Sequence, residues 1–560
     1  MKKNSIFILG FLIALNLFSC KTEETNKAVF SYFEYQGKDQ RFEKTIDPQN
    51  EYFNPIFAGF YPDPSICRKG DDYYLVHSSF SYYPGVPIFH SKDLVNWSQI
   101  GHVLNRPSQL KVDGIRLSGG IYAPAIEYNK YNDTFYMITT CVDGIGNFVV
   151  KTKDPMLDNW SDPIALPKVG GIDPSLFFDD DGKAYIVHND APASTPEWEG
   201  HRAIWIHEYD VEKDETFGER MVILDAGVDR STKPIWIEGP HIYKVNGKYY
   251  LMAAEGGTSV NHTEVVLRAD NVKGPYIPYK NNPILSQKDL PEPRTDIVTS
   301  VGHADLIDTP EGDWYAVFLG CRPYEGNHYN TGRETFLLPV KWENEHPVIL
   351  DKDIPVPTVV EKENLTAQEN FFTGNFIWHD NFQKEELAKE WFFIRNPKGD
   401  WWKQSKNGLE IEPKTITIYE KDNPAFVGRR QQHLVFEAET ELKFTPKSEN
   451  DVAGLVCYQN ERHNFVLAKT MIDGKQYIIL DRAQNENIRI AQLEIPAEYQ
   501  SDVILLKAKG KNDKYSFEVS FNKGKEWQTV AKDIDAKNLS TESAKGFTGT
   551  VIGLYASSGH

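Results

Sequence analysis

Cysteine is scarce in this 560-residue sequence, and its spacing argues against two kinds of stabilising site. Of the five cysteines, four lie beyond residue 60, at positions 67, 141, 321 and 457. None of the four has a close cysteine neighbour in the sequence, so neither a disulfide framework nor a cysteine-based metal site is expected. Three of them lie in apolar, strand-like segments, which predicts buried free thiols.

Positive charge is also in short supply. Lys and Arg number 61 against 80 Asp and Glu, which gives a formal net charge of −19. Polyanions such as nucleic acid are bound by clustered Lys and Arg, so the charge balance excludes a nucleic-acid partner. Aromatic residues, by contrast, make up 13% of the chain, a share suited to β-sheet packing or to stacking against sugars.

The chain lacks an apolar run long enough to span a membrane comfortably. Its one candidate, residues 6–17, follows two lysines and has the length of a secretory signal. The next residues, Leu-Phe-Ser-Cys at 17–20, resemble a bacterial lipoprotein cleavage box. The prediction is a signal peptide over residues 1–20, a lipid on Cys20 and a polar tether over residues 21–50.

This leader sets the expected location. With lipid on Cys20, the protein is exported and anchored to a bacterial membrane, on its periplasmic or cell-surface face, and it contacts the membrane through that anchor only. The alternative is cleavage by an ordinary signal peptidase with loss of Cys20.

A five-fold repeat organises residues 51–354. Each copy has a polar turn, a tyrosine beside the turn and an apolar run. The tyrosines, separated by 62, 49, 65 and 65 residues, are Tyr74, Tyr136, Tyr185, Tyr250 and Tyr315. A turn of Asn, Asp and Gly between strand-like runs is a β-hairpin signal, and units of this length hold about four strands. The repeat therefore predicts a five-bladed β-propeller.

The first strand of each repeat begins 11 or 12 residues before its tyrosine. The residues at these positions are Asp63, Pro124, Asp173, Glu238 and His303. The first strands of propeller blades line a central channel, so these side chains are predicted to meet at one mouth. Each carboxylate alone could be a turn residue, but three carboxylates and a histidine in one register favour a site.

Three carboxylates around a pocket, without a metal-ligand pattern or a phosphate-binding loop, suggest glycoside hydrolysis, which needs one carboxylate and one carboxylic acid. Glu238 is the predicted general acid, because the apolar residues 235–237 before it raise the pKa of a carboxyl group. Asp63 is the predicted general base, held between Pro62 and Pro64, which favour stiff, extended backbone. Asp173 is predicted to orient the substrate and modulate the pKa of Glu238.

The same segments resemble glycoside hydrolase family 43, the five-bladed inverting enzymes, and in particular its β-xylosidase and α-L-arabinofuranosidase members. The resemblance covers residues 54–350 and rests on the segments around the three carboxylates: 60–65, 173–176 and 238–241. It implies an inverting mechanism with Asp63 as base, Glu238 as acid and Asp173 as pKa modulator.

Further segments that resemble the family imply substrate contacts. Phe80 and Tyr122 would form walls of the sugar pocket, with Tyr122 in a place where the family often has tryptophan; packing between blades is the alternative for both. Arg333 would hold sugar hydroxyls, unless it pairs with Glu334 or another carboxylate. His303 would also contact the substrate. In some members the equivalent segment lies beside a calcium ion, which implies a structural calcium near His303, whereas the reaction itself requires no cofactor and no catalytic metal.

The remainder of the chain predicts a second domain. Residues 355–375 are rich in proline and polar residues and are predicted to form a linker, and strand patterns dominate residues 376–560. Residues 428–433 and 453–456 resemble the concanavalin-like C-terminal β-sandwich of xylosidase-type members, which contributes a loop to the pocket. Phe547 would be the aromatic of that loop, or else a core residue of the sandwich. The predicted fold is all-β.

These features predict an exo-acting, inverting glycoside hydrolase that releases xylose, arabinose or both from xylan- or arabinoxylan-derived oligosaccharides. Its partner is then a pentose-containing oligosaccharide, and the oligomeric state stays open. One alternative acts on α-L-arabinofuranosides only. Another is a retaining, fructan-cleaving five-bladed hydrolase, although residues 62–65 depart from the Asn-Asp-Pro-Asn-Gly type of motif usual there. The third is a non-catalytic glycan-binding lipoprotein.

Overall fold

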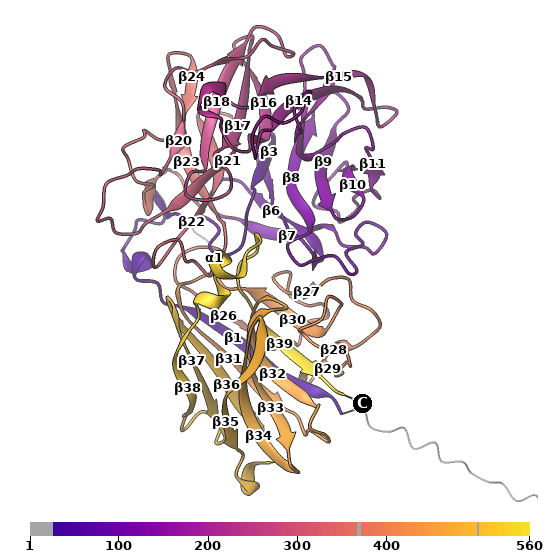
Figure 1. Ribbon diagram of the computed structural model, residues 1–560, viewed down its shortest axis with the longest axis vertical. Helices are drawn as coiled ribbons and strands as arrows, with labels where there is room; N and C mark the ends of the chain where they lie inside the picture. Colours follow the sequence, from indigo (N-terminus) through magenta and orange to yellow (C-terminus); the bar gives the residue numbers. More distant parts are fainter. Residues whose placement is uncertain (1–25, 367–370, 501–502, 560) are drawn as a thin grey trace, which may run out of the picture.

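A computed structural model of the chain describes residues 26–366, 371–500 and 503–559. Figure 1 shows two bodies of β-structure stacked along the long axis, a propeller above and a sandwich below. Helix is limited within the described residues to α1 (Thr541–Ala544) and four 3-10 turns, η1 (Gln40–Glu43), η2 (Arg230–Thr232), η3 (Ala497–Tyr499) and η4 (Lys537–Leu539). The predicted all-β fold, a five-bladed propeller followed by a concanavalin-like sandwich, is confirmed.

Five antiparallel sheets form the blades, each with its strands in chain order. Blade I is β3 (Ser65–Lys69), β4 (Asp72–Val76), β6 (Gly85–Ser91) and β7 (Ser98–Leu104). Blade II is β8 (Gly120–Asn129), β9 (Thr134–Val142), β10 (Gly146–Thr152) and β11 (Ile164–Ala165). Blade III is β12 (Ile172–Phe178), β13 (Ala184–Asp190), β14 (Ala203–Asp210) and β15 (Glu215–Asp225).

The last two blades complete the ring. Blade IV is β16 (Glu238–Val245), β17 (Lys248–Glu255), β18 (Thr263–Ala269) and β19 (Ile277–Pro278), with β20 (Leu285–Ser286) also paired to β18. Blade V is β21 (Thr299–Asp308), β22 (Trp314–Cys321), β23 (Glu334–Glu343) and β24 (His346–Val348). The five first strands contact one another in turn, and β21 returns to contact β3, so the ring is closed.

The strand pairing corrects the predicted register in two blades. In every blade, the residue two positions after the repeat tyrosine pairs with one first-strand residue: Ser65, Ala125, Ser175, His241 or Asp305. Two positions earlier in each blade stand Asp63, Ala123, Asp173, Gly239 and His303. The prediction had Pro124 and Glu238 at these positions, so it was one residue out in blades II and IV.

A shared backbone kink explains why the register was misjudged. All five equivalent residues have a left-handed backbone, with φ between 33° and 58°, and four of them precede a proline. The extended geometry predicted for Asp63 was therefore wrong, since its φ is 52°. A left-handed residue other than glycine costs on the order of 1 kcal/mol. The kink changes the direction of the side chains at the start of each first strand. A prediction that assumes regular alternation of side chains along a strand misses this change.

Two sheets form the sandwich. The first runs β28 (Trp402–Ser405), β29 (Gly408–Ile411), β1 (Ala28–Gly37), β31 (Val435–Lys443), β36 (Ile504–Lys511), β37 (Lys514–Ser520) and β38 (Gln528–Asp535), with β26 (Ile377–Asp380) also paired to β1. The second runs β35 (Glu486–Glu494), β34 (Lys475–Gln484), β33 (His463–Ile472), β32 (Val452–Asn460), β39 (Val551–Ser557), β30 (Ala425–Arg430), β27 (Phe392–Ile394) and β5 (Tyr82–Tyr83).

Strand β1 shows that the predicted tether over residues 21–50 was wrong where the structure describes it. This strand lies inside the first sandwich sheet, between β29 and β31, with Phe30, Phe33 and Tyr35 fully buried. Buried and partly exposed residues alternate along residues 28–37, with one interruption at 31–32, as in a strand with one face against a core. The predicted signal peptide, Cys20 and residues 21–25 lie outside the described residues.

The predicted linker over residues 355–375 also contains a strand. In that segment β25 (Val359–Glu361) pairs with β2 (Glu51–Phe53), and the Asn54 N–H donates to the Thr358 carbonyl at 2.8 Å. The segment therefore packs along the propeller before the chain enters the sandwich.

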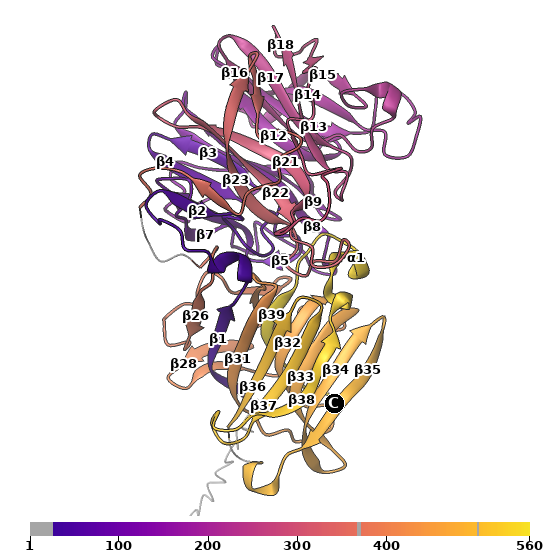
Figure 2. The same ribbon diagram turned by 90° about the vertical axis from the view of Figure 1, so that its left-hand side faces the viewer.

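The two domains share buried polar contacts. Arg322 of blade V donates to Asp39 at 2.8 Å, to Glu334 and to the Gln432 carbonyl at 3.0 Å. These bonds join the propeller to the two parts of the chain that form the sandwich, one before and one after the propeller. Strand β5 of the propeller extends the second sandwich sheet through β27. Figure 2 shows the loops around α1 reaching the underside of the propeller. The domains are thereby held in one arrangement.

The state of the cysteines and the search for a membrane-spanning helix complete the description of the fold. The cysteines at 67, 141, 321 and 457 are free and buried, as predicted. Within the described part of the chain, we find no helix with the length and apolar character needed to cross a membrane.

The place of β1 in the sandwich generates a stability prediction. Phe33→Ala removes a buried ring that packs against Trp391 and Trp378, with centroids 5.1 and 6.2 Å away, and we expect it to lower the free energy of unfolding by about 3–5 kcal/mol. Glu34→Ala, on the more exposed face of the same strand, should change it by less than about 0.5 kcal/mol. Urea unfolding measures both values. Equal, negligible effects would mean that residues 28–37 are a tether after all.

Candidate active site

A cavity of about 500 Å³ opens at the kinked ends of the first strands. Its lining comes from all five blades, from the turns between them and from one loop of the sandwich. Among the lining residues are Asp63, Arg116, Tyr122, Asp173, Ile235, Trp236, Glu238, Thr258, His303, Arg333 and Phe547. The three predicted carboxylates thus share one pocket with three of the predicted substrate contacts from the propeller and with Phe547.

Asp63 is the carboxylate with the most hydrogen-bond donors. It is 5% exposed, and the Arg333 guanidinium donates to both of its oxygens, at 2.8 and 3.4 Å. The Ser78 hydroxyl donates to Oδ2 at 2.6 Å while it accepts the Ala123 N–H at 2.7 Å. These charge-assisted bonds fix the plane of the carboxylate.

Asp173 has a different environment. Burial, together with the nearby charge of Asp63, raises the pKa of Asp173 to about 7, and one weak bond from the Gly239 N–H, at 3.3 Å, opposes the shift. Near neutral pH the Asp173 carboxyl group is therefore partly protonated.

Glu238 is the carboxyl group best suited to stay protonated. Burial raises its pKa well above the usual range, and the charges of Asp173 and Asp63 raise it further. Its Oε1 atom has no hydrogen-bond partner among the described residues. Burial of a carboxyl group with one oxygen unpartnered favours its neutral form, whereas both oxygens of Asp63 accept hydrogen bonds from Arg333. The pocket can thus hold an acid and a base at the same pH.

Arg333 lines the cavity but is committed to Asp63 through two of its N–H groups. The alternative pairing with Glu334 does not occur, because Glu334 is bound by Arg322. The guanidinium carbon lies 5.4 Å from the centroid of the Phe547 ring, a cation–π distance. The contact between Arg333 and sugar hydroxyls stays a prediction.

The aromatic wall consists of Tyr122 and Phe547, whose ring centroids are 5.7 Å apart. Phe547 belongs to the loop after α1, and its N–H donates to the Ser118 hydroxyl at 3.1 Å, so the sandwich contributes to the pocket. Phe80 was predicted as a wall but does not line the cavity. It is 1% exposed and stacks behind Phe547, at 6.3 Å, and beside Phe60, so its place is in the core beneath the wall.

His303 lines the cavity with its Nδ1 atom 4.0 Å from Asp63 Oδ1, and burial lowers the pKa of its ring to about 4. A calcium ion takes six to eight oxygen ligands. No cluster of three or more metal-ligating side chains occurs within residues 26–366, 371–500 and 503–559, and the imidazole is a poor calcium ligand. The described side chains therefore do not form a calcium site by themselves, and the ion near His303 stays a prediction.

Several lining residues were missed by the sequence analysis. Ile235, Trp236 and Thr258 come from turns of blade IV and the segment before it. Ser78, which was also missed, lies behind the lining and donates to Asp63. Arg116 reaches the rim from the segment before β8 and donates to Asp143 at 2.9 Å. The adjacency of Trp236 to Glu238 was the one usable signal, since an aromatic residue beside a predicted acid often lines its pocket.

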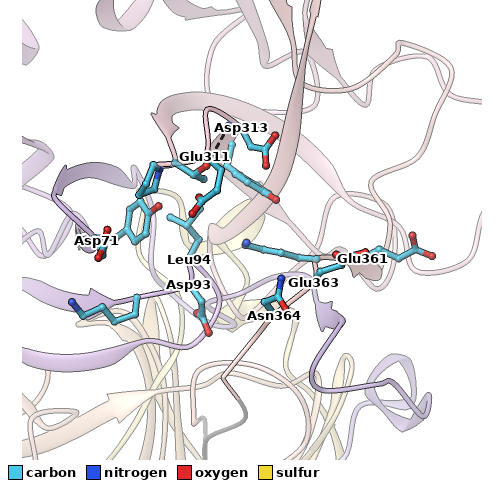
Figure 3. Close-up of a pocket in the computed structure, with 14 residues that line it drawn as sticks. Asp71, Asp93, Leu94, Glu311, Asp313, Glu361, Glu363 and Asn364 are labelled. Carbon is cyan, nitrogen blue, oxygen red and sulfur yellow. Dashed lines mark hydrogen bonds between the residues drawn. The ribbon is translucent and has the colours of Figure 1, made fainter.

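A second hollow, of about 590 Å³, lies between blades I and V and is shown in Figure 3. Its carboxylates are Asp71, Asp93, Glu311, Asp313, Glu361 and Glu363. It shares no lining residue with the candidate active site. Asp93 accepts N–H bonds from Val95, Asn96 and Thr366, which is a structural role in joining the two segments.

Comparison with known proteins agrees with this geometry. A family model described as "Glycosyl hydrolases family 43" matches residues 52–347, and one described as "Beta xylosidase C-terminal Concanavalin A-like domain" matches residues 379–560. The two matches correspond to the propeller and to most of the sandwich.

Named relatives cover nearly the whole chain. A "Xylosidase/arabinosidase" of Butyrivibrio fibrisolvens is 40% identical over 90% of this chain and 95% of its own length. A "Non-reducing end alpha-L-arabinofuranosidase" of Bacteroides ovatus is 35% identical over 91% and 92%. Among solved structures, a "GH43_12 retrieved from capybara gut metagenome" is 45% identical, with a TM-score of 0.89 over 95% of this chain and 100% of that one.

The raised pKa of Asp173 generates a pH-dependent prediction. Its value of about 7, against 3.8 ordinarily, means that the folded state keeps a proton which the unfolded chain loses between these pH values. Ionisation of Asp173 therefore lowers stability as pH rises from 4 to 7. Asp173→Asn cannot ionise and keeps an acceptor for Gly239. We expect near wild-type stability at pH 4 and a gain of about 2–4 kcal/mol at pH 8.

Urea unfolding at the two pH values checks this expectation. Asp308→Asn, at the exposed outer end of β21, is the matched control and should show no such pH-dependent gain. A variant no more stable than wild type at pH 8 would contradict the assignment.

Proposed function

This chain belongs to glycosyl hydrolase family 43 and is a glycosidase, and we propose that it releases terminal xylose, arabinose or both from xylan- or arabinoxylan-derived oligosaccharides. The observation that carries the proposal is the unequal surroundings of two carboxyl groups in one pocket. Asp63 is bonded to Arg333, whereas Glu238 is buried with its Oε1 atom unpartnered among the described residues. Relatives named as xylosidases and arabinofuranosidases support the choice of pentoses.

The proposed mechanism is a single displacement with inversion. Asp63 takes a proton from a water molecule as the water oxygen bonds to the anomeric carbon. The bond from that carbon to the glycosidic oxygen breaks, its electron pair stays on the oxygen, and the oxygen takes the proton of Glu238. Asp173 orients the substrate and, in its ionised form, helps to keep Glu238 protonated through charge repulsion.

The shape of the pocket supports action at chain ends. Phe547 reaches the cavity from the sandwich, and Tyr122 meets it from blade II. A pocket bounded in this way by a second domain suits one terminal sugar better than an internal stretch of a polymer. The proposal therefore favours exo-acting over internal cleavage.

The two catalytic carboxyl groups generate a matched pair of variants. Asp63→Asn and Glu238→Gln should each lower kcat on xylo- and arabino-oligosaccharides by on the order of 10³-fold, because each removes one partner of the proton transfer. Glu238→Gln should spare substrates with a very good leaving group, such as dinitrophenyl pentosides, which need little acid assistance. Asp308→Asn and Glu311→Gln, at the outer end of blade V, serve as controls with wild-type rates.

Product analysis decides between the remaining alternatives. NMR of the first-formed sugar should show the inverted anomer, and a retained anomer would remove the inverting mechanism and favour the fructan-cleaving type of chemistry. Binding of pentose oligosaccharides without any turnover by the wild-type protein would mean that this chain is a glycan-binding protein.

We also propose that the protein is exported and lipid-anchored through Cys20. The support is the leader sequence: a short apolar run and the Leu-Phe-Ser-Cys segment at 17–20. Eight residues after Cys20 the chain enters β1 at Ala28, so a lipid on Cys20 would keep that end of the sandwich within roughly 30 Å of the membrane.

The anchor proposal has a direct test. Wild-type protein should require detergent for release from the membrane fraction of the producing cell, and it should take up labelled palmitate. The Cys20→Ser variant should appear in the soluble fraction of the exported proteins. Its kcat should be unchanged, because Cys20 precedes the folded domains in the chain. Detergent-dependent release of Cys20→Ser would contradict lipidation.

A further inference from the structure

His262 lies behind Glu238 and outside the cavity. It is the residue before β18, its side chain is fully buried, and it is not among the residues that line the pocket. Its Nε2 atom is 4.0 Å from Oε1 of Glu238. It can therefore affect the predicted acid without touching the substrate.

The imidazole ring of His262 occupies a space that Gly302 of blade V leaves free. The φ of Gly302 is +154°, and a Cβ atom there would lie 2.8 Å from Cε1 and Nδ1 of His262. Only glycine at position 302 leaves room for the imidazole in this place. The Val-Gly-His segment at 301–303 thus accommodates one histidine and supplies another to the pocket.

One hydrogen bond determines the tautomer of His262. Its Nδ1 atom is 3.1 Å from the Ser300 carbonyl oxygen, which can only accept, so Nδ1 carries the hydrogen. Burial lowers the pKa of the ring to about 3, so the ring is neutral. Nε2 then presents a lone pair, and this lone pair faces Glu238.

The two facing atoms lack other partners. Neither Nε2 of His262 nor Oε1 of Glu238 has a hydrogen-bond partner within the described parts of the chain. The charged or titratable groups that act on this pair come from the surrounding elements: Asp63, Asp173, Arg202, His303 and Arg333. None of these groups places a donor on Glu238.

We propose that His262 is the positioning residue of the general acid, and that its Nε2 lone pair accepts the O–H of protonated Glu238 and opposes negative charge on Oε1. This inference rests on the proposed function and deepens it. His262 neither gains nor loses a proton during the reaction. The proton passes from Glu238 to the glycosidic oxygen, and His262 extends the pH range over which Glu238 still has that proton to give.

Two substitutions distinguish the role of the Nδ1–H donor of His262 from that of its Nε2 lone pair. His262→Asn keeps a donor for the Ser300 carbonyl and removes the Nε2 end, and His262→Gln can place an N–H donor where the lone pair was. A donor stabilises the carboxylate, whereas an acceptor stabilises the acid. We expect the alkaline limb of the kcat/KM profile to move to lower pH by about 0.5–1 unit in His262→Asn and by about 1 unit or more in His262→Gln.

Measurements on the full chain with xylo- and arabino-oligosaccharides test this, with thermal unfolding as a check on folding. The acidic limb of the profile should stay in place, because the substitutions do not contact Asp63. His207→Asn, on β14 and away from the cavity, is the matched control with an unshifted profile. Gly302→Ala, which displaces the ring without changing a titratable group, should move the alkaline limb in the same direction.

The outcomes are distinguishable. If the wild-type protein hydrolyses no pentoside, the proposed function fails. If it hydrolyses them with a bell-shaped profile and both His262 variants keep the wild-type alkaline limb, only the role of His262 is overturned. A lower kcat/KM in the His262 variants with both limbs of the pH profile unmoved would also overturn the proposal. It would mean that His262 only packs against its neighbours.

Discussion

Three carboxyl groups buried in one pocket cannot all be ionised at low cost, and the way this conflict is resolved determines the site. Arg333 bonds to Asp63 alone, so one carboxylate is stabilised while Asp173 and Glu238 are left in conditions that favour the neutral form. The assignment of base and acid follows from this inequality. This difference between the carboxyl groups requires the neighbouring side chains to stay in place, because it depends on the guanidinium of Arg333 bonding to Asp63 alone.

The fold supplies that rigidity through strained backbone in a closed ring. Left-handed residues recur at the same place in all five blades, and each brings a side chain or a backbone N–H to the mouth of the channel. Gly239 donates to Asp173 from such a kink. The sandwich completes the enclosure, because the buried contacts of Arg322 hold it against the propeller and Phe547 reaches the pocket from it. The local strain is tolerated because both domains determine these positions together.

The sequence analysis succeeded where contacts are local. Tyrosine-anchored hairpins are short-range units, so their five-fold repetition predicted the blades, and the carboxylates beside them were found. The error of one residue at Glu238 arose because a backbone kink has no signature in a pattern of alternation. Phe80 was misassigned, and Ser78 and His262 were missed, because their positions depend on turns packed from other blades. Strand β1 was missed because its partners lie more than 300 residues away in the chain.

The position of β1 means that the propeller is an insertion within the sandwich rather than a domain placed before it. The first strand of the sandwich is synthesised some 340 residues ahead of its first partner in the chain. Closing so long a loop is entropically costly and slow to search. The aromatic side chains of this strand lack their partners during that interval, so folding of this protein depends on keeping residues 28–37 from pairing elsewhere. No single cut of the chain would separate the two domains intact.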